Sequence, residues 1–187
     1  MTLTSNYSSN NEPDFSTLIE ILNHRAKNQP NRTAYIFLQN GEIETTRLTY
    51  QELDRKARAI AAYLYKLEAK GQQALLLYPP GLEFITAFFG CLYASIVAVP
   101  AYPPRRNQKL SRLQAIVENA DIQIVLTTES LLTNIKDLFA NEEDLNNLHC
   151  IATDNIEDKL ELDPQAVKIT GETLAFLQYT SGSTGKP

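Results

Sequence analysis

The sequence predicts an α/β fold in which a mostly parallel sheet carries helices on both faces. Two observations lead to this prediction. Short strand-like segments alternate with helical segments over most of the chain, and the strand-like segments are apolar at nearly every position. Strands with continuous apolar runs are buried on both faces, as in parallel sheets whose connecting helices cover both sides. With 187 residues, 43% of them hydrophobic, the chain is large enough to bury such a core.

Periodicity places the first helix. Apolar residues recur at helical spacing from Phe15 to Ala26, and Asp14 or Ser16 is the expected N-cap. Proline inside a helix removes a hydrogen bond and clashes with the preceding turn. The helix should therefore end before Pro30.

A hairpin and a second helix follow. Asn40-Gly41 is a favoured two-residue hairpin turn, and it joins an alternating strand at 33–38 to a second strand at 42–48. Thr49 and Glu52 have the spacing of a capping box, in which a hydroxyl and a carboxylate each bind a backbone N–H of the first turn. We therefore expect the second helix to begin there.

After Gly71, which is placed to end the second helix, apolar strands alternate with helices. Residues 74–78 form a short apolar strand that Pro79-Pro80-Gly81 ends, and residues 82–94 are apolar nearly all round, like a helix packed on both sides. The elements expected after these are, in order, a strand at 96–99, a helix at 110–119, a strand at 122–126, a helix at 131–140 and strands at 149–152 and 174–180.

Charge and cysteine content exclude several classes of function. The formal net charge of −5 disfavours nucleic acid or an anionic membrane as the main partner. Cys91 and Cys150 have neither a CxxC pair nor a histidine cluster beside them, so two buried free thiols are favoured over a zinc site or a disulfide framework. Residues 1–14 are polar and lack the basic start and apolar run of a signal peptide, which predicts a disordered tail on a cytoplasmic protein.

One uncharged stretch, 84–104, is long enough to cross a bilayer. Gly90, Ser95 and Pro100 interrupt it. A buried helix followed by a buried strand accounts for the same residues, so no membrane span is expected.

Two charged regions have simple interpretations. The acidic segment 141–163 is expected to be a solvated loop region rather than a cation site. A basic cluster is expected to be the solvated start of a helix, with a phosphate-binding or protein-binding patch as the alternative; its members are Arg105, Arg106, Lys109 and Arg112.

The last segment carries the chemistry. The apolar strand 174–180 leads directly into a loop whose candidate phosphate-binding residues are Thr180, Ser181, Gly182, Ser183, Thr184 and Gly185. Glycines let backbone N–H groups approach a polyphosphate closely, and hydroxyls add further donors. A Walker A loop is excluded, because Thr180 stands where its first glycine is required and Pro187 where it has Ser or Thr. A flexible linker is the alternative, but a linker seldom follows so apolar a strand.

The end of the chain resembles the phosphate loop of the adenylate-forming superfamily, which includes acyl-CoA synthetases, peptide-synthetase adenylation domains and luciferases. The matching run is Tyr179-Thr180-Ser181-Gly182-Ser183-Thr184-Gly185-Lys186-Pro187. The family loop continues with Lys-Gly, and Lys186 occupies the family's variable position rather than that of its lysine. The resemblance therefore implies that residues 15–187 are the N-terminal part of an AMP-binding domain and end inside the phosphate loop.

Two proline-rich segments narrow the resemblance. Residues 75–85 include Pro79-Pro80-Gly81, and residues 97–104 end in Pro103-Pro104. Together with residues 113–117 downstream, they are similar to fatty acyl-AMP ligases in particular. The resemblance implies the N-terminal subdomain of the adenylate-forming fold, truncated within the loop.

This resemblance implies a reaction, its cofactor and its partners. A fatty acid would attack ATP, bound with Mg²⁺, to give acyl-AMP and pyrophosphate, and the acyl group would then pass to the phosphopantetheine thiol of an acyl carrier protein. Ser183 and Thr184 are the best side-chain donors to the phosphates. No general base, adenine pocket, Mg²⁺ carboxylate or C-terminal catalytic lysine is identified in the sequence. No catalytic residue or metal ligand is therefore assigned, and the chain alone is expected to be inactive.

Two other interpretations stay open. The chain could belong to an acyl-CoA synthetase or a peptide-synthetase adenylation domain, which the sequence beyond Pro187 would decide. It could also be a non-catalytic, truncated gene product.

Overall fold

The computed structural model describes residues 14–69, 71–105, 110–159 and 168–180. Within them, four strands form a parallel sheet in the order β4-β3-β5-β6, and two others form an antiparallel hairpin. The helices are α1 (Leu18–Asn28), α2 (Tyr50–Lys66), α3 (Leu82–Ala94), α4 (Ser111–Asn119) and α5 (Glu129–Phe139), with a short 3-10 helix η1 (Thr153–Asn155). The strands are β1 (Thr33–Gln39), β2 (Ile43–Thr49), β3 (Gln73–Leu77), β4 (Val97–Ala101), β5 (Ile124–Thr127) and β6 (His149–Ala152). The predicted α/β fold is confirmed.

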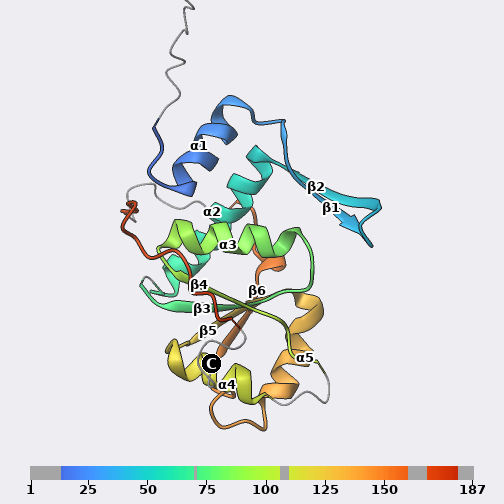
Figure 1. Ribbon diagram of the computed structural model, residues 1–187, viewed down its shortest axis with the longest axis vertical. Helices are drawn as coiled ribbons and strands as arrows, with labels where there is room; N and C mark the ends of the chain where they lie inside the picture. Colours follow the sequence, from blue (N-terminus) through green and yellow to red (C-terminus); the bar gives the residue numbers. More distant parts are fainter. Residues whose placement is uncertain (1–13, 70, 106–109, 160–167, 181–187) are drawn as a thin grey trace, which may run out of the picture.

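Both faces of the parallel sheet are covered. In Figure 1, α2 and α3 lie on one side of it and α4 and α5 on the other. Alternate residues of β3 divide between these sides: Ala74 and Leu76 belong to a first core cluster with α2 and α3, and Leu75 and Leu77 to a second with α4 and α5. This division follows from the two-residue period of a strand, and it explains why β3 is apolar at successive positions.

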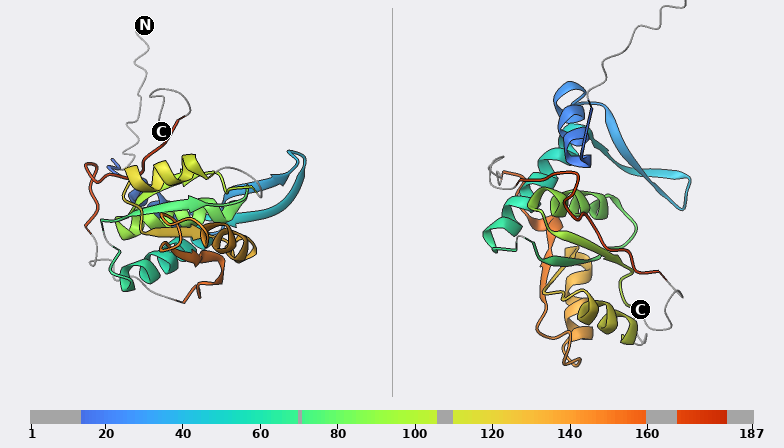
Figure 2. Two further views of the ribbon diagram at one scale, coloured as in Figure 1. Left: turned by 90° about the horizontal axis from the view of Figure 1, so that it is seen from below. Right: turned by 60° about the vertical axis from the view of Figure 1, so that its left-hand side comes forward.

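The hairpin of β1 and β2 projects away from the sheet (Figures 1 and 2). Asn40 and Gly41 have positive φ values of 55° and 80°, as the two central residues of the tightest hairpin turns require. The hairpin and its turn are therefore confirmed; β1 extends one residue further toward the turn than expected, and β2 is shifted by one residue to 43–49.

The first helix begins at a different residue from the one expected. Its N-cap is Thr17 rather than Asp14 or Ser16. The Thr17 hydroxyl accepts the backbone N–H of Glu20 at 3.1 Å, and the Glu20 carboxylate accepts the backbone N–H of Thr17 at 3.1 Å. This reciprocal pair forms a capping box, which satisfies two donors at once and decides the position of the cap.

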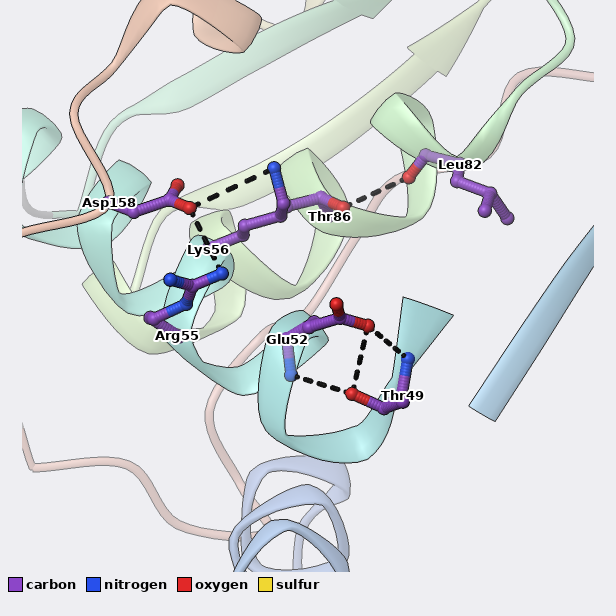
Figure 3. A network of polar contacts seen from close by, with 7 residues as sticks. All are labelled: Thr49, Glu52, Arg55, Lys56, Leu82, Thr86 and Asp158. Atoms are coloured by element: carbon purple, nitrogen blue, oxygen red, sulfur yellow. Dashed lines mark hydrogen bonds and ion pairs between the residues drawn. The ribbon is translucent and has the colours of Figure 1, made fainter. Parts of the chain in front are cut away.

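The capping box predicted for the second helix is confirmed. Thr49 accepts the backbone N–H of Glu52 at 3.2 Å, and Glu52 accepts that of Thr49 at 2.8 Å (Figure 3). Because these hydrogen bonds favour the ionised carboxylate, they lower the pKa of Glu52.

The helix ends differ from expectation. The second helix ends at Lys66 rather than at Gly71, because Glu68 takes the left-handed conformation with a φ of 56°. Ser95 and Asp121 do the same after α3 and α4, with φ values of 56° and 48°. In each case the next N–H returns to a carbonyl of the last helical turn at 2.9–3.3 Å, as in a Schellman motif. The residue that makes this bond is buried and leads toward the next strand; the three are Ala69, Ile96 and Ile122.

The uncharged stretch 84–104 divides between α3, β4 and the residues after it, as expected. Gly90 allows α3 to approach α2 closely, since a Cβ at this position would lie 2.7 Å from the Cγ2 atom of Ile60. No helix in the described part of the chain is long and apolar enough to cross a membrane.

Both cysteines are free. Cys91 is buried, and this burial raises the pKa of its thiol to about 12. Cys150 is half-buried. The expectation of buried free thiols is therefore confirmed for Cys91 and only in part for Cys150.

Replacing Glu68 by glycine should stabilise the protein. A left-handed conformation costs an L-residue about 1–2 kcal/mol, and glycine avoids this cost while losing about 0.5–1 kcal/mol of chain entropy. We expect Glu68→Gly to raise the free energy of unfolding by about 0.5–1 kcal/mol, measured by urea denaturation followed by circular dichroism.

Gly71→Ala is the matched control for this prediction. Gly71 has a φ of 78° and open space around its Cα, so a methyl group there adds backbone strain without a steric clash. This variant should lose about 1 kcal/mol of stability. Equal effects of the two substitutions would contradict the explanation.

Candidate functional site

The structure describes one of the six candidate phosphate-binding residues. Thr180 is exposed at the end of the segment 174–180. The others lie outside the described residues, and they are Ser181, Gly182, Ser183, Thr184 and Gly185. The geometry of the site is therefore that of the segment which leads to Thr180.

This segment lies beside β4 but is not the full strand expected. One parallel bridge joins Phe176 to Ala98, with hydrogen bonds from Ala98 N to Ala175 O at 3.1 Å and from Leu177 N to Ala98 O at 2.9 Å. Two residues after Ala98, Pro100 faces the same edge and has no N–H to donate. The ladder therefore cannot continue, and the prediction of a strand at 174–180 was wrong in its length.

Beyond the bridge, the segment is held by side chains. The rings of Phe176 and Phe88 have centroids 5.7 Å apart, although Phe176 remains 45% exposed. Leu177 and Tyr179 pack against the second core cluster, and the Tyr179 hydroxyl donates to Asn119 Oδ1 at 2.5 Å. Partial burial raises the pKa of Tyr179, which keeps its hydroxyl protonated. The segment thus turns from the edge of β4 toward α4.

A buried polar chain joins the carboxyl ends of three strands. The hydroxyls of Tyr78, after β3, and Thr153, after β6, lie 2.7 Å apart, and Thr153 donates to the carbonyl of Thr127 at 3.4 Å. Thr127, the last residue of β5, donates to the carbonyl of Leu77 at 2.7 Å. Burial raises the pKa of Tyr78 well above its usual value, so the phenol stays neutral. In open α/β sheets, ligands bind at this edge of the sheet.

Sequence reasoning missed this polar chain. The signal was present, because each of the three residues directly follows or ends an apolar strand, at Tyr78, Thr127 and Thr153. The carboxyl ends of neighbouring parallel strands meet at one edge, so polar residues at those positions are expected to be neighbours.

The acidic segment is described as far as residue 159. It contains β6, the strand expected at 149–152, and the short helix η1, and two of its carboxylates contact other elements. Asp154 accepts the backbone N–H of Glu129 at the start of α5, at 2.8 Å. Asp158 lies 3.2 Å from the guanidinium of Arg55 in α2 (Figure 3). Outside β6 and η1, the described residues of this segment form an irregular and largely exposed region, as expected.

The best-formed cavities among the described residues are too small for a nucleotide. The first, of about 110 Å³, lies beside Thr86, whose hydroxyl donates to the Leu82 carbonyl at 3.0 Å (Figure 3). The second, of about 200 Å³, lies between α1, the end of α3 and the residues before Phe176. Sites for ligands of drug size have volumes of about 300–1,000 Å³.

The described residues include no cluster of metal-ligating side chains. Within 14–69, 71–105, 110–159 and 168–180, no group of three or more His, Cys, Asp or Glu is arranged to hold a metal ion.

Comparison with known proteins adds the family context. The family model of the AMP-binding enzyme matches residues 22–187. The chain is 47% identical over 180 residues to JamA, a medium-chain-fatty-acid–[acyl-carrier-protein] ligase of Moorena producens, covering 94% of this chain and 30% of that protein. It is 32% identical over 184 residues to FadD32, a long-chain-fatty-acid–AMP ligase of Mycolicibacterium smegmatis, covering 94% of this chain and 28% of that protein.

A solved structure supports the same relationship. The chain matches a fatty acyl-adenylate ligase from L. pneumophila, in complex with acyl adenylate and pyrophosphate, with a TM-score of 0.78 and 38% sequence identity. The match covers 91% of this chain and 29% of the other. The chain therefore spans about 30% of the length of the relatives that it matches.

The polar chain at the carboxyl edge can be tested with Tyr78→Phe. This change removes one buried hydroxyl and one hydrogen bond, and it should lower the free energy of unfolding by about 1 kcal/mol. Tyr65→Phe is a matched control, because Tyr65 is 43% exposed and its loss of a hydroxyl should cost less than about 0.5 kcal/mol. Urea unfolding of both variants measures the difference; equal stabilities would show that the hydroxyl contributes nothing at this edge.

Proposed function

The chain belongs to the family of AMP-binding enzymes, and we propose that it forms the N-terminal part of a fatty acyl-AMP ligase. The observation that carries the proposal is the 47% identity to a fatty-acid–[acyl-carrier-protein] ligase along 94% of the chain. The match to a fatty acyl-adenylate ligase structure supports it, with a TM-score of 0.78. Because the chain spans about 30% of these relatives, the adenine pocket and most catalytic groups are expected on residues outside it.

The proposed reaction has two steps. A carboxylate oxygen of the fatty acid attacks the α-phosphorus of ATP, and the bond between that phosphorus and the bridging oxygen breaks, releasing pyrophosphate. The thiolate of a phosphopantetheine arm on an acyl carrier protein then attacks the acyl carbon, and AMP leaves. The first step makes the second feasible, because AMP is a far better leaving group than hydroxide.

The run from Thr180 to Gly185 is the proposed contact for the β- and γ-phosphates. Backbone N–H groups near the glycines and the hydroxyls of Ser183 and Thr184 would donate to phosphate oxygens, where negative charge grows as pyrophosphate leaves. We propose Mg²⁺ as the accompanying ion, which would offset phosphate charge when bound, with its protein ligand expected beyond Pro187.

The first test concerns the acyl acceptor. Full-length ligase carrying this chain should transfer its acyl group to a phosphopantetheinylated acyl carrier protein and poorly to coenzyme A. Incubation with ATP, a fatty acid and each acceptor, followed by mass spectrometry, measures both products. Efficient formation of acyl-CoA would contradict the assignment to fatty acyl-AMP ligases, but not the proposal that the enzyme adenylates a fatty acid.

The second test concerns Thr184. Loss of one donor aimed at developing charge lowers a rate on the order of 10²-fold, so Thr184→Ala should slow ATP–pyrophosphate exchange by about that factor with little change in fatty-acid binding. Thr45→Ala is the control, because Thr45 lies in the hairpin and its hydroxyl makes a weak 3.5 Å contact to Phe37 O. If the Thr184→Ala variant exchanges pyrophosphate at the wild-type rate, the Thr184 hydroxyl does not stabilise the developing phosphate charge.

A further inference from the structure

A single polar side-chain contact holds the last described residues before the candidate phosphate loop. Leu177 N makes the last backbone hydrogen bond of this segment within the described residues, to Ala98 O at 2.9 Å. After it, the Tyr179 hydroxyl donates to Asn119 Oδ1 at 2.5 Å, and the Tyr179 ring packs against the second core cluster. Thr180 follows directly in the sequence.

The partner of Tyr179 lies at the end of a helix that packs against the sheet. Asn119 is the last residue of α4, where Asp121 adopts a left-handed conformation and Ile122 N bonds back to Val117 O at 3.0 Å. Leu113, Ile116 and Val117 of the same helix are buried against the sheet. The Asn119 side chain is itself exposed and is not needed for the helix end, so its amide oxygen is available to receive the tyrosine.

Beyond Ala98, the backbone of β4 makes no further hydrogen bond to the segment within the described residues. Pro100 lacks the N–H that a continued ladder would use beside Leu177. The path of the chain from Leu177 to Thr180 is therefore set by side-chain contacts, of which the hydroxyl–amide bond is the directional one.

We propose that Tyr179 and Asn119 are positioning residues for ATP: their hydrogen bond sets the direction in which the chain enters the run from Thr180 to Gly185. Neither residue needs to touch the nucleotide. The inference rests on the proposed function, because it assigns phosphate binding to that run. A small misplacement of groups that orient a substrate lowers affinity and rate, although the groups themselves are unchanged.

The test is a double-mutant cycle in the full-length ligase. Tyr179→Phe and Asn119→Ala should each raise both KM and the calorimetric Kd for ATP by about 2- to 10-fold, the range that one neutral hydrogen bond supplies. The double variant should be no worse than either single variant, because both remove the same bond. Asn119→Asp should keep the wild-type values, since a carboxylate oxygen also accepts the tyrosine hydroxyl.

Three controls separate positioning from general damage. The KM for the fatty acid and the melting temperature should stay unchanged in each variant, and Tyr65→Phe should match wild type throughout. Wild-type ATP affinity in Tyr179→Phe, additive effects in the double variant, or equal increases in both KM values would overturn the inference. If wild type binds ATP but forms no acyl-AMP, the proposed function fails and the Kd comparison still decides the inference; if it binds no ATP, both fail.

Discussion

Burial of β3 on both of its faces is the constraint on which the rest of the structure depends. Leu75, Leu76 and Leu77 have no exposed surface, and each such side chain contributes about 1.5–3 kcal/mol when it leaves water. A strand buried in this way needs a helical layer on each side, which α2 and α3 supply on one face and α4 and α5 on the other. Parallel neighbours on both edges then bring the carboxyl ends of the strands together, where Tyr78, Thr127 and Thr153 form their polar chain.

The segment around Phe176 lies against the outer edge of β4 but does not form a further strand of the sheet. Ala98 donates one hydrogen bond to this segment and accepts one from it, whereas Pro100 has no N–H with which to donate the next. Parallel pairing is thereby limited to one bridge. The other contacts of the segment are the packing of Phe176 on Phe88 and the hydrogen bond from the Tyr179 hydroxyl to Asn119. The chain that leads to the candidate phosphate loop is thus attached by few contacts, each with a distinct direction.

Sequence patterns predicted the elements better than their ends. The helix at 82–94 has the expected bounds, because its nearly continuous apolar run is limited on one side by Pro79-Pro80-Gly81 and on the other by Ser95. The strand at 149–152 also has the expected bounds, although Ile151 is its one buried residue. The end of α2 was misplaced because Glu68, an L-residue, adopts the conformation that sequence rules assign to glycine. The candidate loop residues were identifiable from their composition and spacing. The Tyr179–Asn119 hydrogen bond could not be predicted from the sequence, because its two residues are 60 positions apart and come together only in the folded chain.

The order of the strands along the chain has a consequence for folding during synthesis. The first parallel pair is β3 and β4, joined by α3, and it is complete once residue 101 has left the ribosome. Because domains fold from the N-terminus as they are made, this βαβ unit can form before β5 and β6 emerge. The segment around Phe176 emerges after all four strands of the parallel sheet and meets an edge that already exists. The segment that leads to the candidate phosphate loop is therefore synthesised after the sheet that it joins.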